Sequence, residues 1–111
     1  MGYRVLVTGS SRGIGKAVRD LYLSKGYDVT APGRKELDLE TLDSVKEFVH
    51  DNPDFDIVIN NAGINDIMNI DNLNEESVRS MMTVNLTSPL TLIGGLASGM
   101  KSRRFGRIVN I

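Results

Sequence analysis

A glycine-rich segment near the N-terminus constrains the fold more than any other feature of this sequence. Residues 8–15 read Thr-Gly-Ser-Ser-Arg-Gly-Ile-Gly, and they follow an apolar run at residues 3–8 that predicts a short buried strand. From Ile14 onward, apolar residues recur at three- and four-residue steps, which predicts a helix, and Gly26 predicts its end. Glycines at a strand-to-helix turn allow backbone N–H groups to approach a phosphate, and the helix N-terminus adds a partial positive charge. The segment therefore predicts a dinucleotide site; the alternative is a tight turn whose glycines serve packing only.

The remaining chain alternates short apolar runs with amphipathic segments. Strands are predicted at residues 28–31, 36–39, 55–60 and 107–111, and helices are predicted to open at Thr41 and Asn74. The helix after Asn74 is predicted to continue past Asn85 and to bend near Pro89. This alternation predicts an α/β fold, a parallel sheet with helices on both faces. Only residues 32–35 separate the second and third strands, which leaves open whether the third strand is short, displaced or absent.

Composition excludes several classes of function. The 111 residues are enough for one domain, residues 1–111, and 13 Lys and Arg against 14 Asp and Glu give a formal charge of −1. That balance argues against a nucleic-acid or anionic-membrane partner. The chain has no cysteine and one histidine, which argues against disulfides and a zinc site. Because neither an export signal nor a membrane-spanning apolar stretch is evident, we expect a cytoplasmic protein.

Three more motifs follow the glycine-rich segment in order along the chain. They are Asn60-Asn61-Ala62-Gly63, Asn85 within Thr-Val-Asn-Leu, and the Gly-Arg-Ile-Val-Asn-Ile of residues 106–111. Together with the Gly-x-x-x-Gly-x-Gly spacing of the first segment, the sequence resembles the short-chain dehydrogenase/reductase family. The resemblance implies a truncated Rossmann-like parallel sheet of about five strands, in the order 3-2-1-4-5 if the third strand forms.

The resemblance also implies hydride transfer between NAD(P)(H) and a carbonyl/alcohol pair, with a catalytic Asn, Ser, Tyr and Lys. Only the Asn has a counterpart, Asn85. The chain reaches Ile111 before the positions of the family's Ser and Tyr-x-x-x-Lys, and its own tyrosines, Tyr3, Tyr22 and Tyr27, lie in or beside the first strand and helix. A carbonyl that accepts hydride needs a proton donor at its oxygen. We therefore expect no useful dehydrogenase activity from this chain alone.

The charges near the second strand predict NADP(H) in preference to NAD(H). An NAD site usually has a carboxylate at the end of that strand, whereas this sequence has Ala-Pro-Gly-Arg at residues 31–34. Arg12, Arg34 and Lys35 offer cations for a 2′-phosphate, and in the family a basic residue at the Arg12 position goes with NADP. The alternative is that these cations lie in solvated loops.

Further cofactor contacts are implied by the resemblance. The glycine-rich loop contributes Gly9, Ser11, Arg12, Gly13, Ile14 and Gly15. Asp38, followed by Leu39, matches the family's acidic residue that accepts from the adenine amino group; alternatively its carboxylate serves the N-terminus of the helix opening at Thr41. Asn60, Ala62 and Gly63 would line the ribose and nicotinamide side, although Asn60 could instead cap the strand end.

Three functions follow from these patterns. The favoured one is the NADP(H)-binding portion of a short-chain dehydrogenase/reductase-like oxidoreductase; the alternatives are a non-catalytic NADP(H)-binding sensor or regulatory module and a folded remnant with an empty site. We also expect a homo-oligomer, because residues 107–111 would form an open sheet edge beside apolar helix surface. The candidate residues of that helix surface are Leu90, Leu92, Ile93, Leu96 and Met100.

Overall fold

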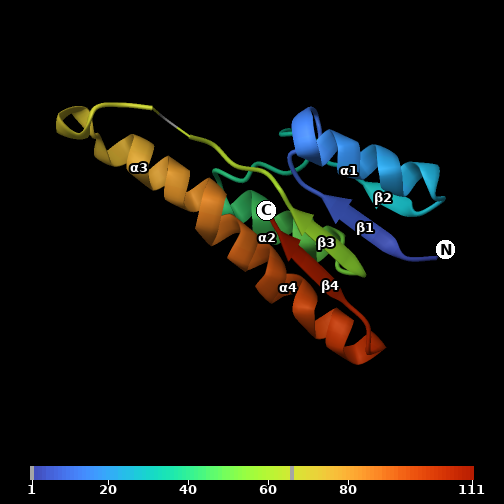
Figure 1. The fold of residues 1–111 in the computed structure, drawn as a ribbon. Helices are drawn as coiled ribbons and strands as arrows, with labels where there is room; N and C mark the ends of the chain where they lie inside the picture. Colours follow the sequence, from blue (N-terminus) through green and yellow to red (C-terminus); the bar gives the residue numbers. More distant parts are fainter. Residues whose placement is uncertain (1, 66) are drawn as a thin grey trace.

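The computed structural model describes residues 2–65 and 67–111. Its described part contains one parallel sheet in the order β2-β1-β3-β4, seen in Figure 1. The strands are β1 (Arg4–Val7), β2 (Asp28–Thr30), β3 (Ile57–Asn60) and β4 (Arg107–Asn110). The α-helices are α1 (Gly13–Ser24), α2 (Leu42–Asp51), α3 (Glu75–Met82) and α4 (Ser88–Arg103), with a 3-10 turn at Ile70–Asn72 and a π-helical turn at Thr83–Thr87.

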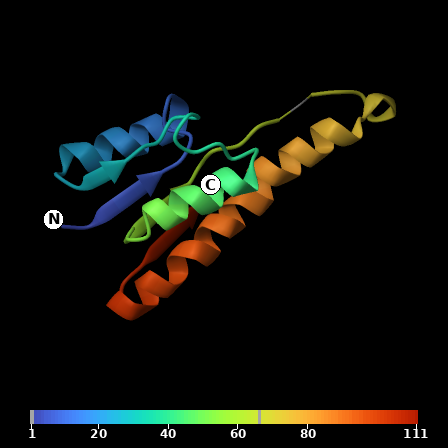
Figure 2. The same cartoon turned by 180° about the vertical axis from the view of Figure 1, so that it is seen from behind.

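Helices cover both faces of the sheet, as Figures 1 and 2 show. On one face Leu6 and Val58 pack with residues of α2 and α4, among them the fully buried Val45 and Leu92. On the other face the apolar side chains of β1 and β3 pack with Val18 and Tyr22 of α1 and with aromatic residues before β2 and β4. The predicted α/β class and a parallel sheet between helices are therefore confirmed.

The third strand predicted at residues 36–39 does not form. Instead the backbone turns, with the N–H groups of Glu36 and Leu37 both donating to the carbonyl of Gly33 at 3.1 and 3.0 Å. Leu37 then inserts into the core between the sheet and α2. A parallel neighbour of β2 would need a crossover of a dozen or more residues, and residues 32–35 cannot supply it. The other four predicted strands form in the predicted relative order.

One long helical segment follows the 3-10 turn, running from α3 through the π turn into α4 (Figure 1). Asn74 caps it as predicted, its side-chain oxygen accepting from the N–H of Ser77 at 2.8 Å. A π turn at Thr83–Thr87, which contains Asn85, precedes Pro89, and the bend near Pro89 stays a prediction. Proline has no N–H to donate to the carbonyl of Asn85, so a regular helix would lose that bond here.

The prediction that this helix has an uncovered apolar face is mostly wrong. Leu92, Leu96 and Met100 are buried against the sheet and α2. The helices approach closely because Gly95 faces Val49, whose Cγ1 would lie 2.6 Å from a Cβ added at Gly95. Leu90 is exposed and Ile93 is half-buried. The predicted open edge is confirmed, since every residue of β4 is exposed and β4 pairs on one side only. In the described part of the chain no helix has the length and apolarity needed to span a membrane.

Candidate nucleotide site

A cavity of about 390 Å³ lies where the central strands end. Its walls come from the glycine-rich loop after β1, the residues after β2, the irregular segment 37–40, and Ala62 after β3. Because the strands are parallel, these carboxyl ends meet at one edge of the sheet, and the order reverses between β1 and β3. Open α/β sheets bind their ligands at such an edge. Of the predicted site residues, the cavity brings together Gly9, Ser11, Arg34, Asp38, Leu39 and Ala62.

The glycine-rich loop is tied to the end of β3 through Thr8. The buried Thr8 hydroxyl accepts from the backbone N–H groups of Asn61 and Ala62, both at 3.1 Å. The Asn61 side-chain amide donates in turn to the carbonyl of Gly9 at 2.9 Å. Neither Thr8 nor Asn61 was among the predicted site residues, although both lie within the motifs that predict the site.

Two glycines of the loop are required by its geometry. Gly9 has φ +66°, and a Cβ there would lie 2.8 Å from the Cα of Ala62. Gly15 is buried in the first turn of α1, where a Cβ would collide with the Gly9 carbonyl. The loop thus keeps a surface on which backbone, not side chains, meets a ligand.

The N-terminus of α1 opens at this loop. Arg12 is the N-cap residue, its side chain makes no capping bond, and the first turn, which begins at Gly13 and Ile14, contains no acidic residue. The first N–H groups of a helix have no partner within the helix, and they carry the positive end of its dipole. This end of α1 can therefore receive an anion.

The predicted cations do not all reach the cavity. Arg34 lines it, whereas Lys35 lines a different cavity, and Arg12 is exposed at the loop without lining either. Arg19 also lines the site, but its guanidinium bonds to Asp20 at 2.9 Å. Hydrogen bonds from Lys16 and from Arg19 lower the pKa of Asp20.

Arg34 is itself surrounded by carboxylates. Its guanidinium forms an ion pair with Glu40, and its Nε lies 3.9 Å from an oxygen of Asp38. Asp38 also accepts from the N–H of Glu40 at 3.0 Å, so its carboxylate orders the turn that leads into α2. The other Glu40 oxygen accepts from the hydroxyl of Ser80, on α3, at 2.6 Å.

Asn85 lies apart from this cavity but contacts the chain beyond β3. Its side-chain oxygen accepts from the N–H of Ile64 and its amide donates to the Ile64 carbonyl, both at 2.8 Å. A Cβ at Gly63 would approach that oxygen to 3.2 Å. The Asn85 amide therefore holds the Gly63–Ile64 backbone.

Asn60 is buried at the end of β3, outside the cavity. Its amide donates to the side chain of Asn110 at 3.0 Å, while its Oδ1 has no partner among the described residues. The structure thus shows a bond between the ends of two neighbouring strands, which agrees with the strand-end alternative for Asn60.

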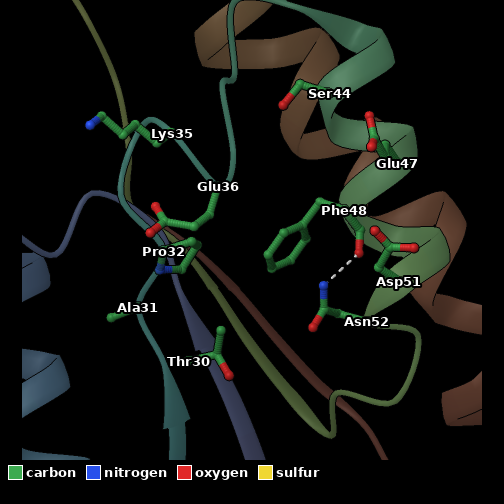
Figure 3. Close-up of a pocket in the computed structure, with 10 residues that line it drawn as sticks. All are labelled: Thr30, Ala31, Pro32, Lys35, Glu36, Ser44, Glu47, Phe48, Asp51 and Asn52. Atoms are coloured by element: carbon green, nitrogen blue, oxygen red, sulfur yellow. Dashed lines mark hydrogen bonds between the residues drawn. The ribbon is translucent and has the colours of Figure 1, made fainter.

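A second cavity, of about 540 Å³, lies between the end of β2 and α2 (Figure 3). Phe48 projects toward its centre, and Glu36, Glu47 and Asp51 surround it. This cavity is larger, but it lacks the glycine-rich loop and the open end of α1. Within the described residues, no cluster of His, Cys, Asp and Glu is suited to a metal ion.

All three tyrosines lie at the far end of the sheet. Tyr3 precedes β1 and stacks on Phe105, which precedes β4, with ring centroids 4.3 Å apart. Tyr27 precedes β2, and Tyr22 meets it edge to face at 5.0 Å. These are the amino ends of the parallel strands, so no tyrosine in the described part of the chain reaches the cavity.

The sequence of this chain is similar to those of known proteins. The model of the short chain dehydrogenase family matches residues 37–111. The 3-oxoacyl-[acyl-carrier-protein] reductase of Haemophilus influenzae is 33% identical over 99% of this chain and 54% of its own length. That match extends over 132 positions, so the relative has residues with no counterpart in these 111.

Solved structures have the same fold. A short chain dehydrogenase/reductase family protein superposes with a TM-score of 0.90 at 29% identity, covering 98% of this chain and 54% of that one. A short-chain dehydrogenase from Sphingobium yanoikuyae in complex with NADPH superposes with a TM-score of 0.88 at 22% identity, covering 97% of this chain and 52% of that one. The chain spans about half the length of these relatives. Its family match, its motifs and its fold agree, and the chain belongs to the short-chain dehydrogenase/reductase family.

Proposed function

We propose that this chain is the NADP(H)-binding portion of a short-chain dehydrogenase/reductase-like oxidoreductase. The observation that carries the proposal is the cavity between the glycine-rich loop and Arg34, at the carboxyl ends of β1 and β2. Its chemistry suits a dinucleotide: a backbone surface kept bare by glycine, an uncapped helix N-terminus, and the guanidinium of Arg34.

Each part of the nucleotide has a set of residues to receive it. The N–H groups of the loop and of the first turn of α1 would hold the diphosphate, and Arg34 would hold the 2′-phosphate as a charged fork. The adenine would lie by Asp38 and Leu39, and the nicotinamide end by Ala62 and Gly63. The bound nicotinamide supplies or accepts hydride.

NADP(H) is the proposed preference because the residues after β2 include a cation and no acid up to Arg34. Arg12 at the loop can add to the attraction when a phosphate is present, since its side chain is exposed and has no partner among the described residues.

The chain by itself is proposed to bind the nucleotide without turnover. A carbonyl reduction needs a proton donor beside the nicotinamide, and the tyrosines of this chain lie at the opposite end of the sheet. Asn85 would act on the site through the backbone that it holds, since its amide is bonded to Ile64.

Calorimetric titration with NADPH and with NADH tests the proposal. We expect NADPH to bind more tightly than NADH. Arg34→Ala should lower the affinity for NADPH by about tenfold or more, with little effect on the affinity for NADH, because a charged hydrogen bond contributes about 1.5–3 kcal/mol. Arg79→Ala on α3 is the matched control, since that arginine is exposed and pairs with Glu75 outside the cavity. Absence of binding by either nucleotide would support the folded remnant instead.

Self-association is proposed through the open edge of β4. Its strand hydrogen bonds are unpaired on one side, and Ile108, Val109 and Ile111 are between 38% and 60% exposed. Light scattering after size exclusion should give a mass above 12.2 kDa, and Val109→Lys should lower it. A monomer at tens of micromolar would contradict this. A cytoplasmic location stays a prediction.

A further inference from the structure

Arg34, the cation on which the NADP(H) preference depends, already has an anionic partner within the chain. Its guanidinium pairs with Glu40, and both residues line the nucleotide cavity. The Arg34 side chain is 75% exposed, so it is accessible to a ligand while it is paired. A 2′-phosphate would therefore have to share this guanidinium with Glu40 or displace Glu40 from it.

Glu40 is held in its place from a second side. One carboxylate oxygen contacts Arg34, and the other accepts from the Ser80 hydroxyl at 2.6 Å. Ser80 belongs to α3, so the carboxylate connects the residues after β2 to the long helical segment. The bond from Ser80 restrains the Glu40 side chain, so that side chain regains less conformational freedom if it leaves Arg34. The bond therefore favours the position in which Glu40 pairs with Arg34.

The carboxylates around Arg34 disfavour the binding of a phosphate. Asp38 lies 3.9 Å from the Nε of Arg34, so two carboxylates adjoin the guanidinium. A 2′-phosphate carries about two negative charges, which would lie beside these carboxylates, and like charges at this range repel. NADH lacks this phosphate and would not meet the same repulsion.

Resting on the proposed nucleotide site, we propose that Glu40 is a specificity-determining residue that competes with the 2′-phosphate for Arg34 and so sets how strongly the chain distinguishes NADPH from NADH. Ser80 is the positioning residue that keeps Glu40 in the competing place. The preference for NADPH is thereby limited by a carboxylate of the chain itself.

Glu40→Gln tests the proposal, because it removes the charge and keeps the size of the side chain. We expect it to increase the affinity for NADPH about two- to fivefold, the range for an exposed ion pair, and to leave the affinity for NADH unchanged. The gain should shrink at high salt, since these charges are exposed. Ser80→Ala should also increase the affinity for NADPH, by a smaller factor. Glu47→Gln is the matched control: it makes the same change of charge on α2, beside the other cavity.

The Arg34→Ala background gives the sharpest comparison. If Glu40 acts mainly through Arg34, then Glu40→Gln improves NADPH binding by a smaller factor once Arg34 is absent, because only the direct repulsion between carboxylate and phosphate is left to relieve. Weaker NADPH binding by Glu40→Gln would show that Glu40 orients Arg34 for the phosphate and would overturn the competition. An unchanged ratio of the two affinities, or an equal shift of both, would overturn it as well. If neither nucleotide binds any variant, the nucleotide site itself is wrong and the competition fails with it; circular dichroism then verifies that each variant is folded.

Discussion

Replacing Thr8 with valine tests whether one hydroxyl holds the glycine-rich loop against β3. The Thr8 oxygen accepts two backbone N–H groups, from Asn61 and Ala62, and its own hydrogen points toward the carbonyl of Ile59 at 3.4 Å. The residue is 3% exposed. Valine has nearly the same shape, so the substitution removes hydrogen bonds while it keeps the packing.

The expected cost follows from these bonds. A buried donor that loses its partner costs about 1–3 kcal/mol. Asn61 and Ala62 are only half-buried, so water can partly replace the lost acceptor and the lower end of the range applies to each. Thr8→Val should therefore lower the free energy of unfolding by about 2 kcal/mol, a large part of the about 5–15 kcal/mol typical of a domain.

Urea unfolding followed by circular dichroism measures this difference. Thr91→Val is the control, because the Thr91 hydroxyl bonds only to the carbonyl of Thr87 in its own helical segment, at 2.8 Å. We expect the control to change stability by less than about 0.5 kcal/mol. If Thr8→Val costs no more than Thr91→Val, then the Thr8 hydroxyl does not hold the loop against β3.

Three other changes test the core and the surface charges. Leu92→Ala removes a fully buried side chain and should cost about 2–5 kcal/mol in a thermal melt; a loss below about 1 kcal/mol would contradict the packing of α4. Ser88→Ala leaves the carbonyl of Leu39 without the donor it now has at 2.5 Å, and urea unfolding should show a loss of about 1–2 kcal/mol. The pKa of Asp20 is lowered, first by the hydrogen bond from Lys16, so this carboxylate stabilises the fold above its ordinary pKa of 3.8 and ceases to do so as pH falls through the lower folded value. Asp20→Asn should therefore lower the melting temperature at neutral pH and not in strong acid; an equal loss at both would exclude the charge as the cause.

Local patterns predicted most of the elements. The strand, the glycine-rich turn and the helix up to Gly26 all form, and Gly26 has the positive φ, +82°, that a glycine allows at a helix end. The cap at Asn74 forms as its side chain and position predict. Such signals depend on residues a few positions apart, whose geometry the backbone itself determines, so the sequence suffices to predict them.

Pairings between distant residues could not be predicted in this way. Nothing in the sequence near Glu40 indicates Ser80, because the two meet only when α3 lies beside the segment after β2. Thr8 and Asn61 meet across the ends of neighbouring strands in the same manner. In each case the partner depends on how the elements pack.

The alternation of apolar runs and amphipathic segments was enough to predict the parallel sheet, and the four motifs in order were enough for the family resemblance and the expected place of a nucleotide. Tertiary structure decided which of those residues meet. Arg34 reaches the cavity and Arg12 does not line it, and residues 36–39 become an irregular segment whose Leu37 fills the core. The physical reason is that apolar burial and the length of each connection determine where the segments lie, and both are properties of the whole packed chain.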